Sequence, residues 1–349
     1  MEKIVIHRPG GFGELRLETH PDPAPGPGEV LVRTKAVGVN FADCVVRRGL
    51  YASAKKYVGW PITPGFDIAG HVAAAGPDVD HFNKGDAVFG ITRFGGYATH
   101  VAVPARQLRP LPKALSMEEA AAFPAVFLTA YHALHQNIRL RPGMTALVHS
   151  AAGGVGGALC QILKIAKCEV VGVVGSAAKT GFALAGGAHA VIDKSAGNFW
   201  AKARQLAPQG YDLILDANGA DTLKESYRHL GPSGKLIVYG FHSMFPKAGG
   251  GTNWLHIIRD VIRMPRFNPL RMTQENKSVI AFNLSFLFSR TDLYDEAMDE
   301  LIRWLGEGRL KPPQVTVYPL SEAARAQEVL ESGRTTGKLV LSTSGGSLN

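Results

Sequence analysis

The chain has 349 residues, of which 46% are apolar and 19% are charged, and this composition excludes a disordered chain. Its length predicts two domains, because single hydrophobic cores rarely grow beyond about 250–300 residues. The net charge of +9 comes from scattered Lys and Arg residues without a recognition motif, so nucleic-acid binding is not expected.

The cysteines and the amino terminus indicate in which cellular compartment the protein is expected. Cys44, Cys160 and Cys168 form no CxxC pair, which predicts neither a zinc nor a disulfide framework and fits a reducing cytoplasm. Residues 1–10 do not read as a signal peptide. No run approaches the roughly 20 apolar residues of a membrane span. We therefore expect a soluble, cytoplasmic protein without stable membrane insertion.

The first third of the chain is typical of a β-barrel or sandwich. Short strand-like runs alternate with Pro/Gly clusters, and the runs cover residues 3–7, 15–18, 29–37, 69–75 and 96–103. The character changes at Ser116, which forms a capping box with Glu119 and predicts a helix start.

From Thr145 the pattern alternates strand and helix. Strands are predicted at 146–150, 170–174, 190–192, 213–216 and 234–240, with helices at 154–167, 177–185, 199–206 and 222–230. Repeated βα units predict a doubly wound parallel sheet that binds its ligand at the carboxyl ends of the strands. A helix at 293–305 and strands near 315 and 338–342 indicate a return to the first domain.

A glycine-rich turn follows the first of these strands. Gly153, Gly154 and Gly156 leave room for a pyrophosphate to approach the backbone N–H groups at a helix start. Ala151 stands where the usual motif has its first glycine, so the turn alone is also compatible with a structural role. The βα context favours a dinucleotide.

The choice of cofactor depends on the end of the second strand of this sheet. NAD enzymes commonly carry an acidic residue there, whereas this chain has Gly175 and Ser176, followed by Lys179. A 2′-phosphate could bind the Ser176 hydroxyl and pair with Lys179, which predicts NADPH. The alternative is that Lys179 is an ordinary solvated helix lysine.

The whole chain resembles the zinc-independent quinone oxidoreductases of the medium-chain dehydrogenase/reductase superfamily. Four segments carry the resemblance: Gly38–Asp43, Pro64–Gly70 with Lys84–Val88, Leu128–Tyr131 and His149–Gly156. Residues 252–288 and 336–341 resemble the homologues of the synaptic vesicle amine transport protein.

The resemblance implies an α/β fold in which a GroES-like β-rich catalytic domain, residues 1–124 plus 290–349, contains an inserted Rossmann NADPH-binding domain, residues 125–289. The positions that hold catalytic zinc in related alcohol dehydrogenases are here Asn40, Phe66 and Ala125, which cannot replace thiolate and imidazole ligands. It therefore implies that no metal is bound. A homodimer is also implied.

The resemblance further implies a set of site residues. Asn40 and Tyr51 are the candidates for catalysis. The residues expected to contact NADPH are Asn40, Thr129, Ala152, Gly153, Gly154, Val155, Gly156, Gly175, Ser176, Lys179, Lys194, Asn218, Gly240, Phe241 and Lys338.

The reaction that we expect is hydride transfer to a quinone or to the β-carbon of an α,β-unsaturated carbonyl. Asn40 and Tyr51 would lie near the substrate oxygen, although Tyr51 could equally be a packing aromatic. Asp43 and Asp67 are expected to be structural hydrogen-bond acceptors. We also expect His132 and His149 to be structural.

Two other kinds of function stay open. Trp254, Ile257, Ile258, Val261 and Ile262 form an apolar helical stripe beside Arg259, Arg263 and Arg266, as in helices that bind membranes or partners. A helix that covers the cleft or a dimer contact is the expected alternative. An NADPH-binding sensor with little turnover is the remaining possibility.

Overall fold

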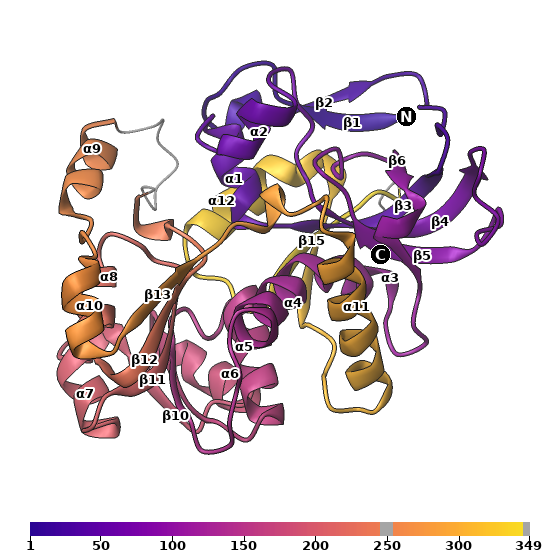
Figure 1. The fold of residues 1–349 in the computed structure, drawn as a ribbon. Coiled ribbons are helices and arrows are strands. Elements are labelled where there is room, and N and C mark those ends of the chain that lie inside the picture. The colour runs from indigo at the N-terminus through magenta and orange to yellow at the C-terminus, as the bar shows by residue number, and fades with distance from the viewer. Residues whose placement is uncertain (245–253, 345–349) are drawn as a thin grey trace. The chain divides into compact units, whose positions relative to one another are not determined.

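The computed structural model describes residues 1–244 and 254–344. Within these residues the chain forms two compact units, coloured by chain position in Figure 1. The first unit holds residues 1–126 and 285–344, and the second holds residues 127–244 and 254–284. Helix α4 (Pro124–Tyr131) carries the chain from the first unit into the second.

The first unit is built on a mostly antiparallel sheet of seven strands. Six of them follow the order β14-β15-β3-β4-β5-β7, and β6 pairs with β3. A separate pair, β1 and β2, completes the strands of this unit. Their bounds are β1 (Glu2–Val5), β2 (Arg16–Thr19), β3 (Glu29–Val39), β4 (Asp67–Ala75), β5 (Ala87–Ile91), β6 (His100–Pro104), β7 (Leu108–Pro110), β14 (Val315–Pro319) and β15 (Lys338–Ser342).

Helices of the first unit close its core. Ser116 and Glu119 form the expected capping box, in which the Glu119 amide donates to Ser116 Oγ over 3.2 Å and the Ser116 amide donates to Glu119 Oε2 over 2.8 Å. The helices are α1 (Phe41–Arg47), α2 (Ala52–Tyr57), α3 (Met117–Ala122), α11 (Thr291–Gly306) and α12 (Ala323–Glu331). Strand β15 pairs with β3 and strand β14 pairs with β15, so the chain does return to the first unit.

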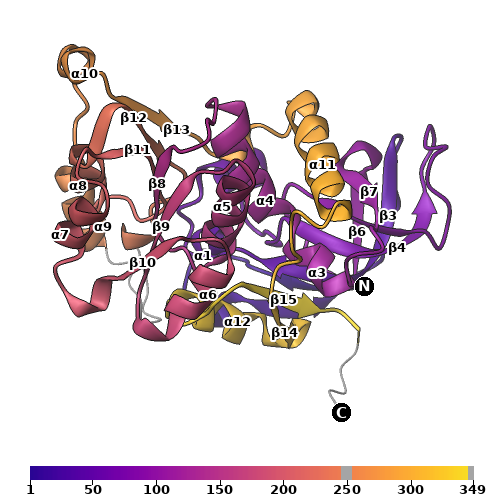
Figure 2. The same ribbon diagram turned by 90° about the horizontal axis from the view of Figure 1, so that it is seen from below.

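The second unit is a six-stranded sheet in which every neighbouring pair is parallel, in the order β10-β9-β8-β11-β12-β13. Figure 2 shows α5 and α6 on one face of this sheet and α7 and α8 on the other. The bounds are β8 (Thr145–Val148), α5 (Gly154–Ile165), β9 (Glu169–Val174), α6 (Thr180–Ala185), β10 (Ala190–Asp193), α7 (Phe199–Leu206), β11 (Tyr211–Asp216), α8 (Leu223–Arg228), β12 (Leu230–Val238), α9 (Trp254–Arg263), α10 (Pro269–Glu275) and β13 (Ser278–Ala281). The expected α/β fold with a Rossmann sheet and a GroES-like β-rich unit is confirmed.

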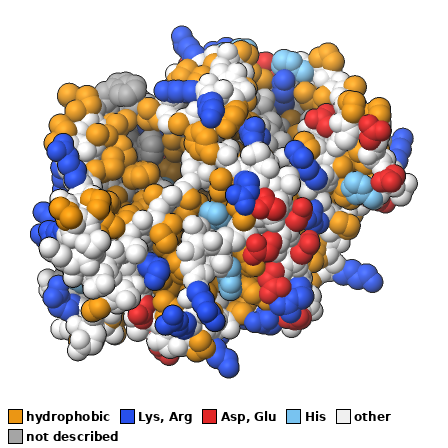
Figure 3. Space-filling view, in the orientation of Figure 1, with side chains coloured by type: hydrophobic (Ala, Val, Ile, Leu, Met, Phe, Trp, Pro, Cys, Tyr) orange, Lys and Arg blue, Asp and Glu red, His pale blue; other side chains and the backbone are white. Residues whose placement is uncertain are grey.

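Helix α9 leaves much of its apolar stripe exposed. Ile258 and Ile262 are 53% and 78% exposed, whereas Asp260 is buried. Arg259 lies 3.3 Å from Asp260. Hydrophobic side chains gather on the side of Figure 3 where Figure 1 places α9. Ile258, Val261 and Ile262 are therefore not covered by the described residues, and a role of this helix as a cover for the cleft or as a dimer contact stays a prediction.

A membrane-spanning helix would need a long apolar run. In the described part of the chain, every helix is too short or too polar to cross a bilayer.

Candidate active site

The glycine turn lies at the carboxyl end of β8, where the chain enters α5. Ser150 adopts a left-handed conformation with φ of 55°, and its carbonyl accepts from the Gly153 amide over 2.8 Å. Gly153 is the N-cap of α5 and supplies no side chain that could cap the helix. The first-turn amides of α5 therefore face the end of the sheet, in the arrangement that binds a phosphate at a helix N-terminus.

Gly156 is the glycine on which this turn depends. A Cβ built there would lie 2.2 Å from the Ser150 carbonyl oxygen and 2.8 Å from Ala151 Cα. Both contacts are with backbone, so a side chain at position 156 can only be accommodated if α5 moves away from the turn.

We expect Gly156→Ala to destabilise the fold by about 1–3 kcal/mol and to weaken NADPH binding, because the helix start must shift. Gly157→Ala is the matched control, since its Cβ would approach nothing closer than 3.9 Å. Thermal unfolding with and without NADPH measures both effects. Equal behaviour of the two variants would contradict this account of the turn.

The two lysines expected at the 2′-phosphate lie beside the ends of β9 and β10. A Cβ on Gly175 would be 3.9 Å from Lys194 Cε, so the Lys194 side chain passes the end of β9. Burial lowers the pKa of Lys179, and the charge of Lys194 lowers it further. An anion that binds between two ammonium groups offsets their repulsion and favours the charged form of both.

Asp193, the last residue of β10, lies next to Lys194 in the chain. Its carboxylate accepts from the Ser195 amide over 2.8 Å and from Ser195 Oγ over 2.7 Å. These hydrogen bonds lower the pKa of Asp193, so the acid stays ionised at the end of β10. The cationic character of this corner therefore depends on the two lysines together.

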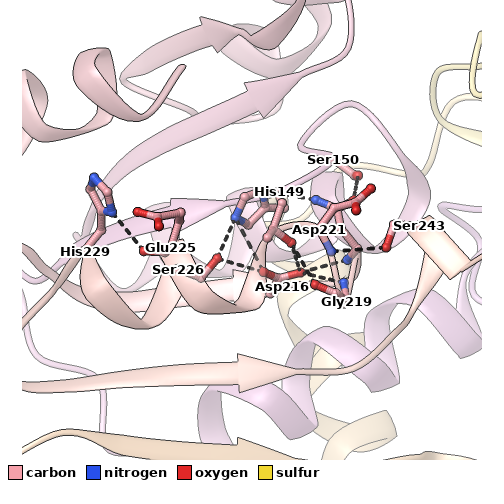
Figure 4. A network of polar contacts seen from close by, with 11 residues as sticks. His149, Ser150, Asp216, Gly219, Asp221, Glu225, Ser226, His229 and Ser243 are labelled. Atoms are coloured by element: carbon pink, nitrogen blue, oxygen red, sulfur yellow. Dashed lines mark hydrogen bonds and ion pairs between the residues drawn. The ribbon is translucent and has the colours of Figure 1, made fainter. Parts of the chain in front are cut away.

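A buried polar network supports the carboxyl end of β11 (Figure 4). Asp216 Oδ1 accepts from the Asn218 amide over 2.8 Å and from Thr222 Oγ1 over 3.0 Å. Asp216 Oδ2 accepts from Ser226 Oγ over 2.8 Å. His149 Nε2 lies 3.2 Å from Ser226 Oγ and 3.7 Å from Asp216 Oδ2.

This network sets the state of His149 and the orientation of Asn218. Because Ser226 donates its proton to Asp216, its oxygen is left to accept from His149 Nε2–H. His149 Nδ1 is then an acceptor for Asn218 Nδ2, 3.2 Å away. Burial lowers the pKa of His149, which favours this neutral form. His149 is thus a structural imidazole, as expected, and the Oδ1 of Asn218 faces Ser150 Oγ at 3.5 Å.

The expected residues after β12 lie next to this network. The His242 amide donates to the Ala217 carbonyl over 2.9 Å, which holds the segment after Gly240 against the end of β11. Phe241 packs against Gly219, where a Cβ would lie 2.8 Å from its ring. Burial also lowers the pKa of His242 to about 4, so this imidazole is neutral.

In the first unit, Asn40 and Lys338 meet at one carboxylate. Lys338 Nζ lies 3.1 Å from Asp67 Oδ2, and Asn40 Nδ2 donates to the same oxygen over 2.8 Å. Lys338 Nζ also donates to Asn40 Oδ1. Asp67 Oδ1 accepts from the Ala125 amide over 2.7 Å. The side-chain amide of Asn40 is therefore fixed in one orientation, and none of the described residues accepts from its second Nδ2–H.

Asp43 is the second buried carboxylate near Asn40. It accepts from the backbone amide of Asn40 over 2.8 Å, from the backbone amide of Gly65 over 3.0 Å and from Tyr97 Oη over 3.0 Å. Asp43 and Asp67 are thus hydrogen-bond acceptors within the fold, as expected. Burial raises the pKa of Asp43 from 3.8 to about 7, against the effect of its donors and of Lys338.

The raised pKa of Asp43 predicts a pH dependence of stability. The folded state holds this proton more tightly than the unfolded state, so its contribution is complete below about pH 4 and is lost as the pH rises through about 7. We expect Asp43→Asn to remove that part of the slope, although loss of one acceptor lowers stability at every pH. Measuring Tm across this pH range checks the prediction. Asp80→Asn is the control, because the Asp80 side chain is exposed. An unchanged slope in Asp43→Asn would contradict the assignment.

Tyr51 precedes α2 and packs with two other aromatic residues. Its ring centroid lies 5.9 Å from that of Phe66 and 6.3 Å from that of Phe94, in edge-on geometry. Phe66 and Phe94 are themselves 5.0 Å apart. We call Tyr51, Phe66 and Phe94 the aromatic cluster. Tyr51 fits its expected packing role, and its part in catalysis stays a prediction.

At the positions that hold zinc in related alcohol dehydrogenases, Phe66 and Asn40 make other contacts in this structure. Phe66 is packed in the aromatic cluster, and Asn40 is committed to Asp67 and Lys338. Within the part of the chain that the structure describes, no three His, Cys, Asp or Glu side chains are grouped to hold a metal ion.

Three residues that support the site were not singled out for that role from the sequence. Asp216 and Ser226 hold the end of β11, and Asp67 was expected to accept hydrogen bonds but not to pair with Lys338. Asp67 and Lys338 are separated by 271 residues, so no local pattern links them. Asp216 ends a buried strand, which is the one pattern that could have pointed to it.

A parallel nucleotide-type sheet with a glycine turn, inserted in the sequence of a GroES-like β-rich unit, defines the class of medium-chain dehydrogenases/reductases. Family models agree with this class. Residues 26–113 match the alcohol dehydrogenase GroES-like domain, and residues 186–341 match the model described as zinc-binding dehydrogenase.

Individual relatives narrow the class. The chain is 32% identical over 340 residues to the synaptic vesicle membrane protein VAT-1 homolog of Rattus norvegicus, covering 97% of this chain and 83% of the relative. It is 30% identical over 347 residues to the quinone oxidoreductase of Mus musculus, covering 98% and 97%. The crystal structure of Escherichia coli quinone oxidoreductase complexed with NADPH superposes with a TM-score of 0.85 at 29% identity, covering 98% and 100%. The chain belongs to the medium-chain dehydrogenase/reductase superfamily, in its quinone oxidoreductase and VAT-1 branch.

Proposed function

We propose that this protein is an NADPH-dependent reductase that transfers a hydride to a quinone or to the β-carbon of an α,β-unsaturated carbonyl. The observation that carries the proposal is the pair formed by Lys179 and Lys194 beside the glycine turn. The relatives named quinone oxidoreductase, one of them solved with NADPH, support the same reaction.

The described residues fit the cofactor in chemistry. The open amides at the start of α5 would bind the pyrophosphate, and Gly156 keeps them in place. Ser176, Lys179 and Lys194 would bind the 2′-phosphate. Asn218, held by His149, would present its Oδ1 at the end of β11. Thr129, Gly240, Phe241 and Lys338 stay proposed contacts at the nicotinamide end.

NADPH, when bound, supplies the hydride. Asn40 then has one defined task, which is to donate its remaining N–H to the substrate oxygen as negative charge develops there. Tyr51 would provide a second donor near the same oxygen. The proton that completes the reduction comes from solvent or from such a donor, and a strong acid is not required.

The test is consumption of NADPH by the purified protein with a panel of quinones and alkenals. We expect turnover with at least one of them, with NADPH preferred over NADH. Calorimetric binding of NADPH without turnover on the whole panel would instead support a sensor with little activity. Absence of NADPH binding would overturn the proposal.

A second candidate function rests on α9. Leu255, Ile258, Val261 and Ile262 are exposed beside Arg259, which is the arrangement of a helix that lies on an anionic membrane surface. We propose peripheral binding to anionic lipid, in line with the name of the VAT-1 relatives. Flotation with anionic vesicles, and its loss in Ile258→Glu with Ile262→Glu, would support it. Failure of the unmodified protein to float would remove it.

We also propose a cytoplasmic homodimer. The edge strand β13 pairs only with β12 among the described strands, so one side of it is available to a second copy. Light scattering of the purified protein measures the assembly state.

A further inference from the structure

Beside the aromatic cluster lies an arginine that the proposed reaction does not use. The Arg93 guanidinium carbon is 4.3 Å from the ring centre of Tyr57 and 5.0 Å from that of Phe288. Phe288 packs against the same hydrophobic core as Phe94 and Tyr51. Arg93 thus contacts two rings beside the core that holds the aromatic cluster and its proposed substrate donor.

Arg93 lacks the partners that a held guanidinium usually has. Its Nε is buried and has no hydrogen-bond partner, and no ion pair or hydrogen bond joins Arg93 to another residue in the described chain. By contrast, the buried Arg47 and Arg48 both pair with Glu331. A buried donor without an acceptor costs free energy, which a ligand that brings an acceptor recovers.

A neighbour of the aromatic cluster strengthens the case for an anionic ligand. Trp60, which packs against the same core, has a buried Nε1 that also lacks an acceptor in the described structure. The surroundings of the aromatic cluster therefore offer positive charge and unused donors next to rings that suit a planar ligand.

We propose that Arg93 selects a substrate that carries an anionic group, such as a carboxylate, on a planar quinone or enone. Its guanidinium would bind the anion while the rings of the cluster pack on the conjugated part of the ligand. This inference rests on the proposed function, because only a reductase would use the ligand as its substrate. The anion site itself rests on the buried Arg93 Nε, which has no acceptor among the described residues.

The test compares a neutral naphthoquinone with a naphthoquinone sulfonate as substrates, in the unmodified protein and in Arg93→Met. We expect Arg93→Met to raise the KM for the sulfonate by about tenfold or more, because a charge-assisted contact is lost. The KM for the neutral quinone should stay within about threefold. Arg93→Lys, which keeps the charge but loses the planar fork, should fall between the two.

Lys56→Met is the matched control, because it removes an exposed cation whose Nζ lies 5.1 Å from the ring centre of Tyr57. We expect it to change the KM for the sulfonate by less than about threefold. If Arg93→Met raises the KM for both quinones alike, Arg93 only supports the packing and the proposal is wrong. Equal loss of sulfonate selectivity in Lys56→Met and Arg93→Met would also overturn it, since general charge would then suffice.

Calorimetry with naphthalenesulfonate separates this inference from the proposed function. Binding that weakens in Arg93→Met, in a protein that reduces no quinone, would keep the anion site and remove the reductase. Turnover of quinones without any effect of Arg93 on sulfonate binding would keep the reductase and remove the anion site.

Discussion

Replacing Lys179 and Lys194 together by alanine should abolish the preference for NADPH over NADH. Burial lowers the pKa of Lys179 and the charge of Lys194 lowers it further, so we expect one phosphate to relieve the repulsion between the two ammonium groups. Charge-assisted contacts of this kind contribute about 1.5–3 kcal/mol each. We therefore expect the Kd for NADPH to rise by about 100-fold or more, with the Kd for NADH changed by less than about threefold.

Calorimetry with both cofactors measures this change, and Lys224→Ala is the control. Lys224 is an exposed lysine on α8 in the same unit, so it matches the loss of charge without touching the ends of β9 and β10. The single variants add information, because two lysines that share one phosphate should lose less together than the sum of their separate losses. A cofactor preference that survives the double substitution would show that the 2′-phosphate binds elsewhere.

Lys338→Met should produce the largest loss of stability of any single change considered for this chain. Lys338 is 4% exposed and Asp67 is fully buried, and their charged atoms are 3.1 Å apart. Removing one partner leaves an uncompensated buried charge, which costs about 3–5 kcal/mol. We expect the midpoint of urea unfolding to fall accordingly, even without cofactor.

The double variant Lys338→Met with Asp67→Asn separates the stability that comes from the ion pair from the other roles of Lys338. It should recover most of the lost stability, because no unpaired charge remains. Both variants should nevertheless lower kcat, since Asn40 loses the partner that holds its Oδ1. If Lys338→Met leaves the apo protein as stable as before, Lys338 acts through the cofactor alone and the ion pair contributes little.

Most of the second unit could be predicted from residue pattern, because βα units are local. Helix α5 and strands β9 and β10 lie within a few residues of their expected positions, and the glycine turn joins β8 to α5 as expected. The first unit was harder to predict. Short elements such as α1, α2 and β5 have too few residues for a clear hydrophobic period, and their ends are set by tertiary contacts.

The stripe on α9 shows the limit of periodicity in another way. The pattern correctly predicted an amphipathic helix, but periodicity does not tell which face is covered. In the structure, Asp260 lies inside and Ile262 lies outside. The direction of a helix face depends on what the rest of the chain leaves for it to pack against.

The class of the protein, the glycine turn and the absence of thiolate and imidazole at the zinc positions can all be read from residue type and short spacing. Which side chains act on one another depends on the folded chain. Folding joins Asp67 to Lys338 across 271 residues and His149 to Asn218, and it buries Arg93 Nε beside two rings with no acceptor among the described residues. The physical reason is that ion pairs and buried hydrogen bonds act over a few ångströms in space, and the chain reaches those distances only when it is folded.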